Sequence, residues 1–152
     1  MGHTLPRMNV LQAIGRHVPF AELLGVRVAH HEPGRAVLEI DLRPDLMNSW
    51  QVAHGGVVMT LADIALAVSA LTLDTGAKGA MTIELKVSFI GPGVGTLVAE
   101  GRCLRAGRSL AFCEGEVRDR GGKLVAKALG TFRLRRGRAS PGDAVAPDDA
   151  ES

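Results

Sequence analysis

The twenty residues from His54 to Leu73, HGGVVMTLADIALAVSALTL, limit the possible folds of this chain more than any other segment. The segment is apolar on nearly every side, and a helix of that kind is stable in water only when other elements surround it. Its one acidic side chain, Asp63, lies among aliphatic residues, where an unpaired carboxylate is costly. An aspartate at mid-length also disfavours a membrane span. We therefore expect a buried central helix and no membrane partner.

Alternating apolar residues on both sides of this segment predict β-strands. Two short runs precede it and four follow it, at 26–28, 36–42, 81–89, 96–105, 109–119 and 123–135. In the run 81–89 the alternation places Thr82 on the face opposite to Leu85 and Val87. Two strands, a long helix and four strands predict an α+β fold, in which one antiparallel sheet curls around the helix.

The length and composition of the chain suit one domain. It has 152 residues, of which 46% are hydrophobic, and this is enough for one sizeable core. We expect a single domain over residues 1–136, which begins with a short helical segment at 8–24 that Gly25 ends. Residues 137–152 are rich in Gly, Ala, Pro and Asp, and we expect them to form a disordered tail.

Charge and composition exclude several classes of partner. The formal net charge is only +2 and most basic residues are scattered, so a nucleic-acid surface is not indicated. The N-terminus lacks the apolar core of a signal peptide, which predicts a cytoplasmic protein. Cys103 and Cys113 lack the paired spacing of a zinc or redox site, so we expect buried free thiols and no metal.

Two features of the central helix are suited to catalysis. Gly55 and Gly56 follow His54 and present unobstructed backbone N–H groups at a helix N-terminus, where the negative charge of an oxyanion is stabilised. Asp63 lies in apolar surroundings, which raise the pKa of a carboxyl group toward the range of a general base. Each feature also has a structural explanation: the glycines serve tight packing, and the aspartate caps a neighbouring loop.

The spacing of these two features limits how they can act together. Gly55 and Asp63 are eight residues apart, which is about 12 Å along a helix. An oxyanion donor and a base that serve one carbonyl group must each lie about 3 Å from the reacting atoms. If both act, two copies must therefore pair with antiparallel helices, so that Gly55 of one copy meets Asp63 of the other. Small or semi-polar residues surround Asp63 on its helix face and permit this approach: Gly56, Met59, Thr60, Ala67 and Ala70.

With this order of elements, the stretch NSWQVAHGGVVMTLAD resembles the hotdog-fold acyl-CoA thioesterases of the PaaI-like group, named after a phenylacetate-degradation thioesterase. The resemblance extends from about Pro19 to Leu134. It implies a sheet wrapped around the long helix and a homodimer with two composite sites. It further implies that pairs of dimers form a homotetramer.

The resemblance also implies a role for each residue of the motif. Asp63 matches the acid that acts as general base on water or attacks the thioester directly, and the Gly55 amide matches the donor to the thioester carbonyl. Asn48 matches a side chain near the sulfur or the water, and His54 matches the residue that orients this asparagine. Thr82 matches a hydroxyl group that helps to hold the nucleophilic water.

Substrate contacts follow from the same resemblance. The family often has glycine between the asparagine and the histidine, where this chain has Trp50 and Gln51, so the acyl preference of the family is not carried over. Gly56, Trp50 and Met59 are expected to contact the substrate, and the phosphates of coenzyme A to lie near Arg105 and Arg108. The alternatives are that Trp50 and Met59 belong to the core and that the two arginines belong to a solvated turn. Coenzyme A is part of the acyl-CoA substrate, and no cofactor is needed.

Two other functions remain open from the residues alone. A hotdog hydratase or dehydratase would depend on a histidine paired with an acid, so that loss of His54 would be as severe as loss of Asp63; no glutamate lies in the helix to support this. A non-catalytic acyl-CoA binding module would release no thiol from any substrate. The presence of Asn48, Gly55 and Asp63 together argues against the binding module.

Overall fold

The computed structural model describes residues 8–9, 17–73 and 76–137. In chain order the elements are β1 (Met8–Asn9), α2 (Pro19–Leu24), β2 (Arg27–Glu32), β3 (Arg35–Asp41), the 3-10 turn η1 (Pro44–Leu46), α3 (Gly55–Leu71), β4 (Gly79–Phe89), β5 (Thr96–Ala106), β6 (Leu110–Asp119) and β7 (Leu124–Arg135).

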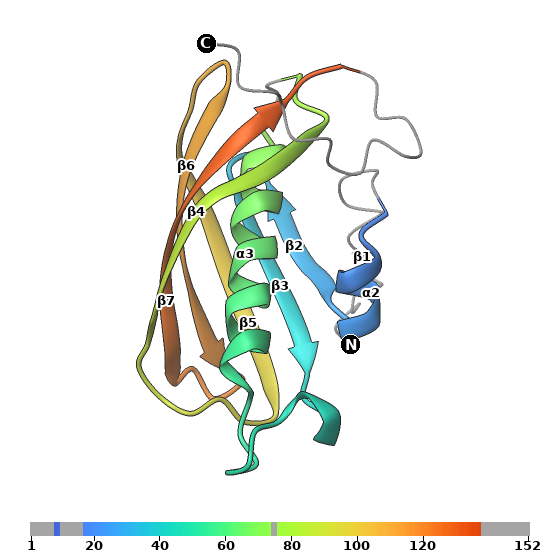
Figure 1. Ribbon diagram of the computed structural model, residues 1–152, viewed down its shortest axis with the longest axis vertical. Helices are drawn as coiled ribbons and strands as arrows, with labels where there is room; N and C mark the ends of the chain where they lie inside the picture. The colour runs from blue at the N-terminus through green and yellow to red at the C-terminus, as the bar shows by residue number, and fades with distance from the viewer. Residues whose placement is uncertain (1–7, 10–16, 74–75, 138–152) are drawn as a thin grey trace, which may run out of the picture.

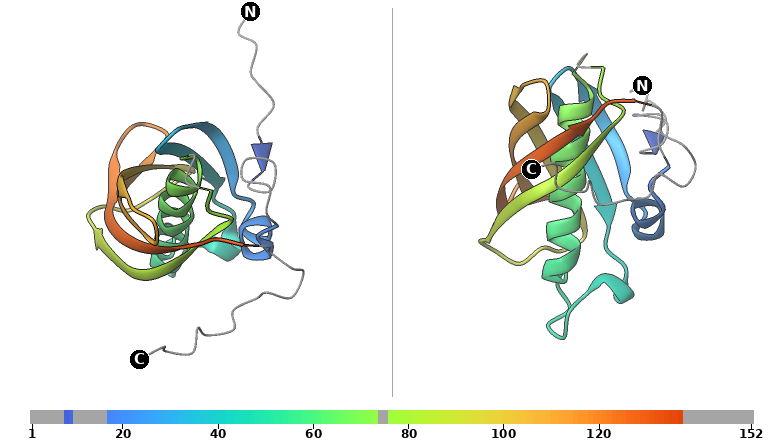
Figure 2. Two further views of the ribbon diagram at one scale, coloured as in Figure 1. Left: turned by 90° about the horizontal axis from the view of Figure 1, so that it is seen from above. Right: turned by 45° about the horizontal axis from the view of Figure 1, so that its top comes forward.

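The described strands form one antiparallel sheet with the order β1-β2-β3-β5-β6-β7-β4. The sheet curls around α3, so that β2 and β3 lie on one side of the helix and β4 and β7 on the other (Figures 1 and 2). This confirms the predicted α+β hotdog fold, in which a sheet is wrapped around one long helix. No helix in the described part of the chain is long and apolar enough to cross a membrane.

The helix α3 and the sheet approach each other closely at a pair of glycines. Gly101 of β5 and Gly115 of β6 are directly opposite each other on neighbouring strands. A Cβ atom at Gly101 would overlap the backbone carbonyl group of Ala65, and one at Gly115 would meet the side chain of Leu66. The missing side chains therefore let α3 lie directly on the sheet, and Ala65 and Leu66 are fully buried as a result.

The N-terminal prediction was only partly right. Met8 and Asn9 pair with β2 as a short strand, so the helical segment predicted for 8–24 is limited in the described residues to Pro19–Leu24. Proline favours the first turn of a helix because it has no N–H to satisfy, and Gly25 ends α2 with a φ of 75°. Residues 10–16 and nearly all of the predicted tail, 138–152, lie outside the described residues.

The close approach of α3 and the sheet is testable by adding one methyl group. We expect Gly101→Ala to lower the free energy of unfolding by about 1 to 3 kcal/mol, because the new Cβ would press against backbone that cannot rotate away. Urea denaturation measures this. Gly107→Ala is the control, since a Cβ there would make only an ordinary contact of 3.7 Å. Equal stability of the two variants would contradict this account of the packing.

Candidate active site

Asp63 of α3 is held by a hydroxyl group from β4. Thr82 Oγ1 donates a hydrogen bond of 2.7 Å to Asp63 Oδ1. The predicted strand alternation had placed Thr82 on the face opposite to Leu85 and Val87, and this was wrong. The ladder between β4 and β7 shifts register between Thr82 and Glu84, where Ile83 is an extra residue. Such a bulge reverses the phase of the strand, and Thr82 consequently faces α3 with Leu85 and Val87.

The carboxyl group of Asp63 is half-buried, and burial is the main influence on its acidity. Removal from water raises the pKa of Asp63 above its ordinary value, and the hydrogen bond from Thr82 partly opposes this by stabilising the ionised form. A carboxyl group in this condition is a stronger base than an exposed aspartate and keeps one oxygen fixed. Both properties suit a group that accepts a proton from water or attacks a carbonyl carbon.

Asp63 and Thr82 line a cavity of about 260 Å³ between α3 and β4. Its walls are mostly apolar, and its third side is formed by the chain just before α2. The remaining lining residues are His17, Val18, Ile64, Ala67, Val68, Leu71, Gly79 and Ala80. Of these, the sequence analysis had identified only Ala67, because its helical spacing from Asp63 was visible. The other contacts depend on how distant segments meet, and no local pattern indicated them.

The N-terminus of α3 presents one free backbone donor. His54 is the N-cap, and its Nδ1 accepts a hydrogen bond of 2.9 Å from the Gly56 amide. The Gly55 amide has no acceptor among the described residues. A Cβ atom at Gly55 would lie 3.5 Å from the ring of Phe89, so the end of β4 packs against this terminus. Gly55, and not Gly56, is therefore the amide available to an oxyanion.

Asn48 stabilises the loop that leads into α3. Its Oδ1 accepts hydrogen bonds from the amides of Trp50, at 2.9 Å, and Val52, at 3.4 Å. Gln51 in this turn has a φ of 59°, in the region that favours glycine. This fits the family preference for glycine at this point of the motif. The Trp50 side chain at the tip of the loop is 83% exposed.

The predicted site residues thus form two groups within one chain. Asp63 and Thr82 are in contact, and His54, Gly55 and Gly56 form the helix start that follows the Asn48 loop. Within the described residues, His54 makes no hydrogen bond to Asn48, and its Nδ1 instead binds the Gly56 amide. The remaining predicted contacts do not line the Asp63 cavity: Gly56, Trp50, Met59, Arg105 and Arg108.

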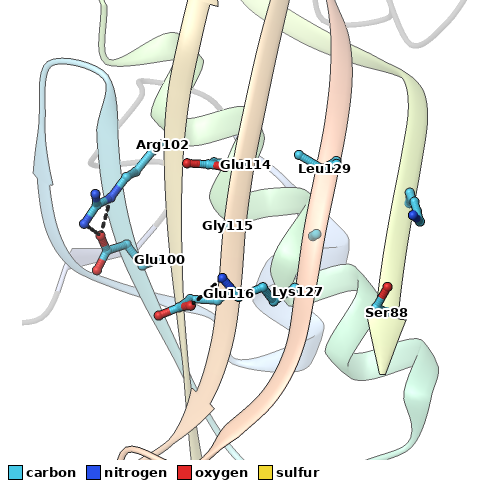
Figure 3. A pocket seen from close by; sticks show the side chains of 10 residues that line it. Ser88, Glu100, Arg102, Glu114, Gly115, Glu116, Lys127 and Leu129 are labelled. Carbon is cyan, nitrogen blue, oxygen red and sulfur yellow. Dashed lines mark hydrogen bonds and ion pairs between the residues drawn. The ribbon is translucent and has the colours of Figure 1, made fainter. Parts of the chain in front are cut away.

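A larger hollow of about 430 Å³ lies on the outer face of the sheet (Figure 3). Its lining carries as many acidic as basic side chains, and several are paired with each other. Arg102 contacts Glu100 at 2.6 Å, and Lys127 contacts Glu116 at 3.5 Å. Asp63 is not part of this hollow, and its charged walls do not suit an acyl group. The smaller cavity at Asp63 is therefore the candidate active site.

Comparison with known proteins agrees with this geometry. The sequence model of the thioesterase superfamily matches residues 51–126, which is half of the chain and includes the N-terminus of α3, Asp63 and Thr82. The chain belongs to the thioesterase superfamily. The predicted assignment to thioester hydrolases is thereby confirmed, and the predicted likeness to PaaI is confirmed for the fold.

Three relatives of this thioesterase-superfamily chain illustrate the range of similarity. SSO2140 of Saccharolobus solfataricus, a candidate esterase, is 38% identical over 116 residues, which cover 76% of this chain and 82% of that protein. YigI of Salmonella typhimurium, named as a medium/long-chain acyl-CoA thioesterase, is 27% identical, and the match covers 88% of this chain and 99% of YigI. The solved structure of PaaI from the phenylacetic acid degradation operon of Escherichia coli is similar in fold, with a TM-score of 0.75 and 24% identity. The match covers 84% of this chain and 92% of the PaaI chain.

The bond between Thr82 and Asp63 predicts a shift in pH dependence. Thr82→Val removes a hydrogen bond that lowers the pKa of Asp63, so the carboxyl group should stay protonated to higher pH. We expect the acid limb of the pH profile of kcat/KM for thioester hydrolysis to move to higher pH in this variant. Thr82→Ser keeps the hydroxyl group and should leave the limb in place. Coincident profiles for Thr82→Val and the wild type would contradict the assigned influence of Thr82.

Proposed function

We propose that this protein is an acyl-CoA thioesterase that hydrolyses the thioester of an acyl- or aryl-acyl-CoA to the free acid and CoA. The observation that carries the proposal is the half-buried Asp63 carboxyl group, fixed by Thr82 at the wall of an apolar cavity. At about 260 Å³ the cavity is smaller than the sites of about 300 to 1,000 Å³ that enclose whole small ligands. It therefore suits the acyl group, with CoA outside and its phosphates near Arg105 and Arg108.

The proposed reaction has two variants that use the same residues. With Asp63 as general base, its carboxylate takes a proton from water as the water oxygen attacks the thioester carbon. The Gly55 amide stabilises the oxyanion, the carbon–sulfur bond breaks, and the CoA thiolate receives the proton from Asp63. With Asp63 as nucleophile, its oxygen displaces the thiolate, and water then hydrolyses the resulting anhydride. Asn48 would lie near the sulfur or the water, with His54 fixing the adjacent helix start.

We propose a homodimer because one subunit does not bring these groups together. Asp63 is eight residues from Gly55, about 12 Å along α3. The two groups also contact β4 at separate positions, Asp63 at Thr82 and Gly55 at Phe89. Two β4 strands in antiparallel contact would place the Thr82 half of one beside the Phe89 half of the other. Each composite site would then combine Asp63 of one subunit with Gly55 of the partner subunit.

The free edge of β4 supports this assembly. Among the described strands β4 pairs only with β7, so its other edge is unpaired. Ile83, Phe89 and Ile90 on or beside β4 are each more than half exposed. An unpaired edge with exposed apolar side chains is a site for pairing with another strand. We further expect two such dimers to form a homotetramer, as the family resemblance implies.

Charge selects a register for the proposed pairing. If Leu85 lies on the two-fold axis, Glu84 faces Lys86 of the partner subunit twice, and both are exposed on the outer face. If Lys86 lies on the axis, two lysines face each other. Opposite charges on paired strands are favourable and like charges are not. Both registers keep Thr82 and Val87, which face α3, on the same side of the continuous sheet, so the charges alone distinguish the two registers.

The proposed base is tested by Asp63→Asn, which is nearly isosteric but cannot accept the proton or attack as a carboxylate. We expect kcat for thiol release to fall by about a hundredfold or more. The assay should cover short, medium, branched and aromatic acyl-CoA esters. Sedimentation velocity should show an unchanged oligomer. Full activity in this variant would remove Asp63 from the mechanism, and no thiol release by the wild type with any ester would remove the function.

The dimer register is tested by charge reversal. Glu84→Lys and Lys86→Glu should each weaken the dimer by about tenfold, since each turns two attractive contacts into repulsive ones of about 0.5 to 1 kcal/mol. The double variant Glu84→Lys/Lys86→Glu should restore the dimer, as measured by sedimentation equilibrium. Glu114→Lys, on β6 away from this edge, serves as the control. Dimers that are equally stable in all variants would overturn the register.

A further inference from the structure

The two cysteines of the chain lie directly opposite each other on neighbouring strands. Cys103 of β5 and Cys113 of β6 are partners in the antiparallel ladder between these strands. Both are free thiols; the expected burial holds for Cys113, whereas Cys103 is partly exposed. The sequence contains no other cysteine. Folding therefore brings together two thiols whose spacing in the sequence resembles neither a zinc site nor a redox motif.

The backbone contacts of β5 show which kind of pair the two cysteines form. The Cys103 amide donates a hydrogen bond of 2.8 Å to the Gly34 carbonyl group, on the side of β5 away from β6. Cys103 and Cys113 are accordingly a non-hydrogen-bonded pair, in which opposite side chains approach most closely. The Cβ atoms of such a pair are about 4.5 Å apart, and a disulfide requires about 3.5 to 4.5 Å. A bond between the two sulfur atoms therefore needs only a small shift of the strands.

The ladder beside this pair can accommodate such a shift. The register between β5 and β6 changes between Cys103 and Arg105, so that Leu104 is an extra residue. A bulge of this kind interrupts the ladder and leaves its extra residue unpaired. The strand is consequently less constrained next to Cys103 than in the regular part of the ladder.

The two thiols differ in their access to a reagent. The Cys113 thiol is buried close to the Ser69 hydroxyl group of α3 and to the Cys103 thiol. Burial, with a smaller contribution from Cys103, raises the pKa of the Cys113 thiol to about 12. The thiolate is the reactive form of cysteine, so Cys113 is not the first to react. Cys103 is the thiol that a reagent from solution can reach.

We propose that Cys103 and Cys113 are an oxidative modification site, at which a low-molecular-weight disulfide such as oxidised glutathione joins β5 to β6 through a disulfide bond. The Cys103 sulfur attacks one sulfur of oxidised glutathione, whose S–S bond breaks, and the first glutathione leaves with the proton of Cys103. The Cys113 sulfur then attacks the Cys103 sulfur, and the second glutathione leaves with the proton of Cys113. Two protein thiols are oxidised, and one glutathione disulfide is reduced to two thiols.

The second step is intramolecular, which compensates for the low acidity of Cys113. A thiol with a pKa of about 12 is ionised to about one part in 10⁵ at pH 7. Reacting groups that are held in contact can reach effective concentrations of about 10⁵ M or more. The bond would lie beneath the part of α3 that carries Ser69, and neither cysteine lines the cavity at Asp63. The inference is therefore independent of the proposed thioesterase function.

The test exposes the folded wild-type protein to oxidised glutathione and counts free thiols by mass spectrometry after trapping with iodoacetamide. We expect the loss of both thiols, a mass lower by two hydrogen atoms, and full reversal by dithiothreitol. We also expect the melting temperature to rise by about 5 °C, because the bond restricts the unfolded chain. A melting temperature that does not rise would show that the folded sheet does not accommodate the bond, and would overturn the proposal.

Two single variants give the matched controls. Cys113→Ala keeps the accessible thiol and should stop at the mixed disulfide, with one glutathione attached. Cys103→Ala keeps only the buried thiol and should retain it free, and a glutathione adduct on this variant would overturn the assigned order of attack. A stable glutathione adduct on the wild type, or two free thiols after the treatment, would overturn the site itself. If the variants do not fold, the thiol count of the wild type decides alone.

Discussion

The helix α3 is apolar around nearly its whole circumference, and the need to bury it determines the shape of the sheet. A flat sheet could cover only one side of such a helix, whereas a curled sheet contacts it from β3 through β5 and β6 to β7 and β4. The pair Gly101 and Gly115 removes the side chains that would hold the two layers apart. Close contact in turn buries the helix residues that face the sheet.

The described strands do not close around α3, and the candidate active site lies in the gap that remains. Met59, Asp63 and Ala67 lie on the side of α3 that the sheet covers least, while β4 forms one margin of the gap and the segment before α2 the other. A carboxyl group here is buried enough for its pKa to be raised and open enough to meet a substrate. At the same opening, one edge of β4 pairs with no other described strand. In the proposed dimer, the opening beside Asp63 and the exposed edge of β4 would serve the same interface.

The sequence predicted the parts of this structure that depend on local pattern. Alternation located β3 to β7, and the apolar run with Asp63 located α3. Thr82 was placed on the wrong face by alternation alone, because one extra residue at Ile83 changes the phase of β4 and no local pattern marks it. His17 was missed because its place in the cavity depends on how a distant segment packs. The roles proposed for Asp63 and Gly55 rest on chemistry, spacing and the family resemblance, which can be read from a sequence before the neighbours of a residue are known.

The strand β4 connects the two halves of the site through its length. One end holds Asp63 through Thr82, and the other end covers Gly55 through Phe89. The number of residues in β4 therefore sets the distance between these two contacts. The bulge at Ile83 allows Thr82 and Phe89 both to face α3. An insertion or deletion between these ends would turn one contact away from α3 while leaving the other in place. Changes of length in this family should accordingly be confined to hairpins and termini, and this strand should keep its count even where its side chains vary.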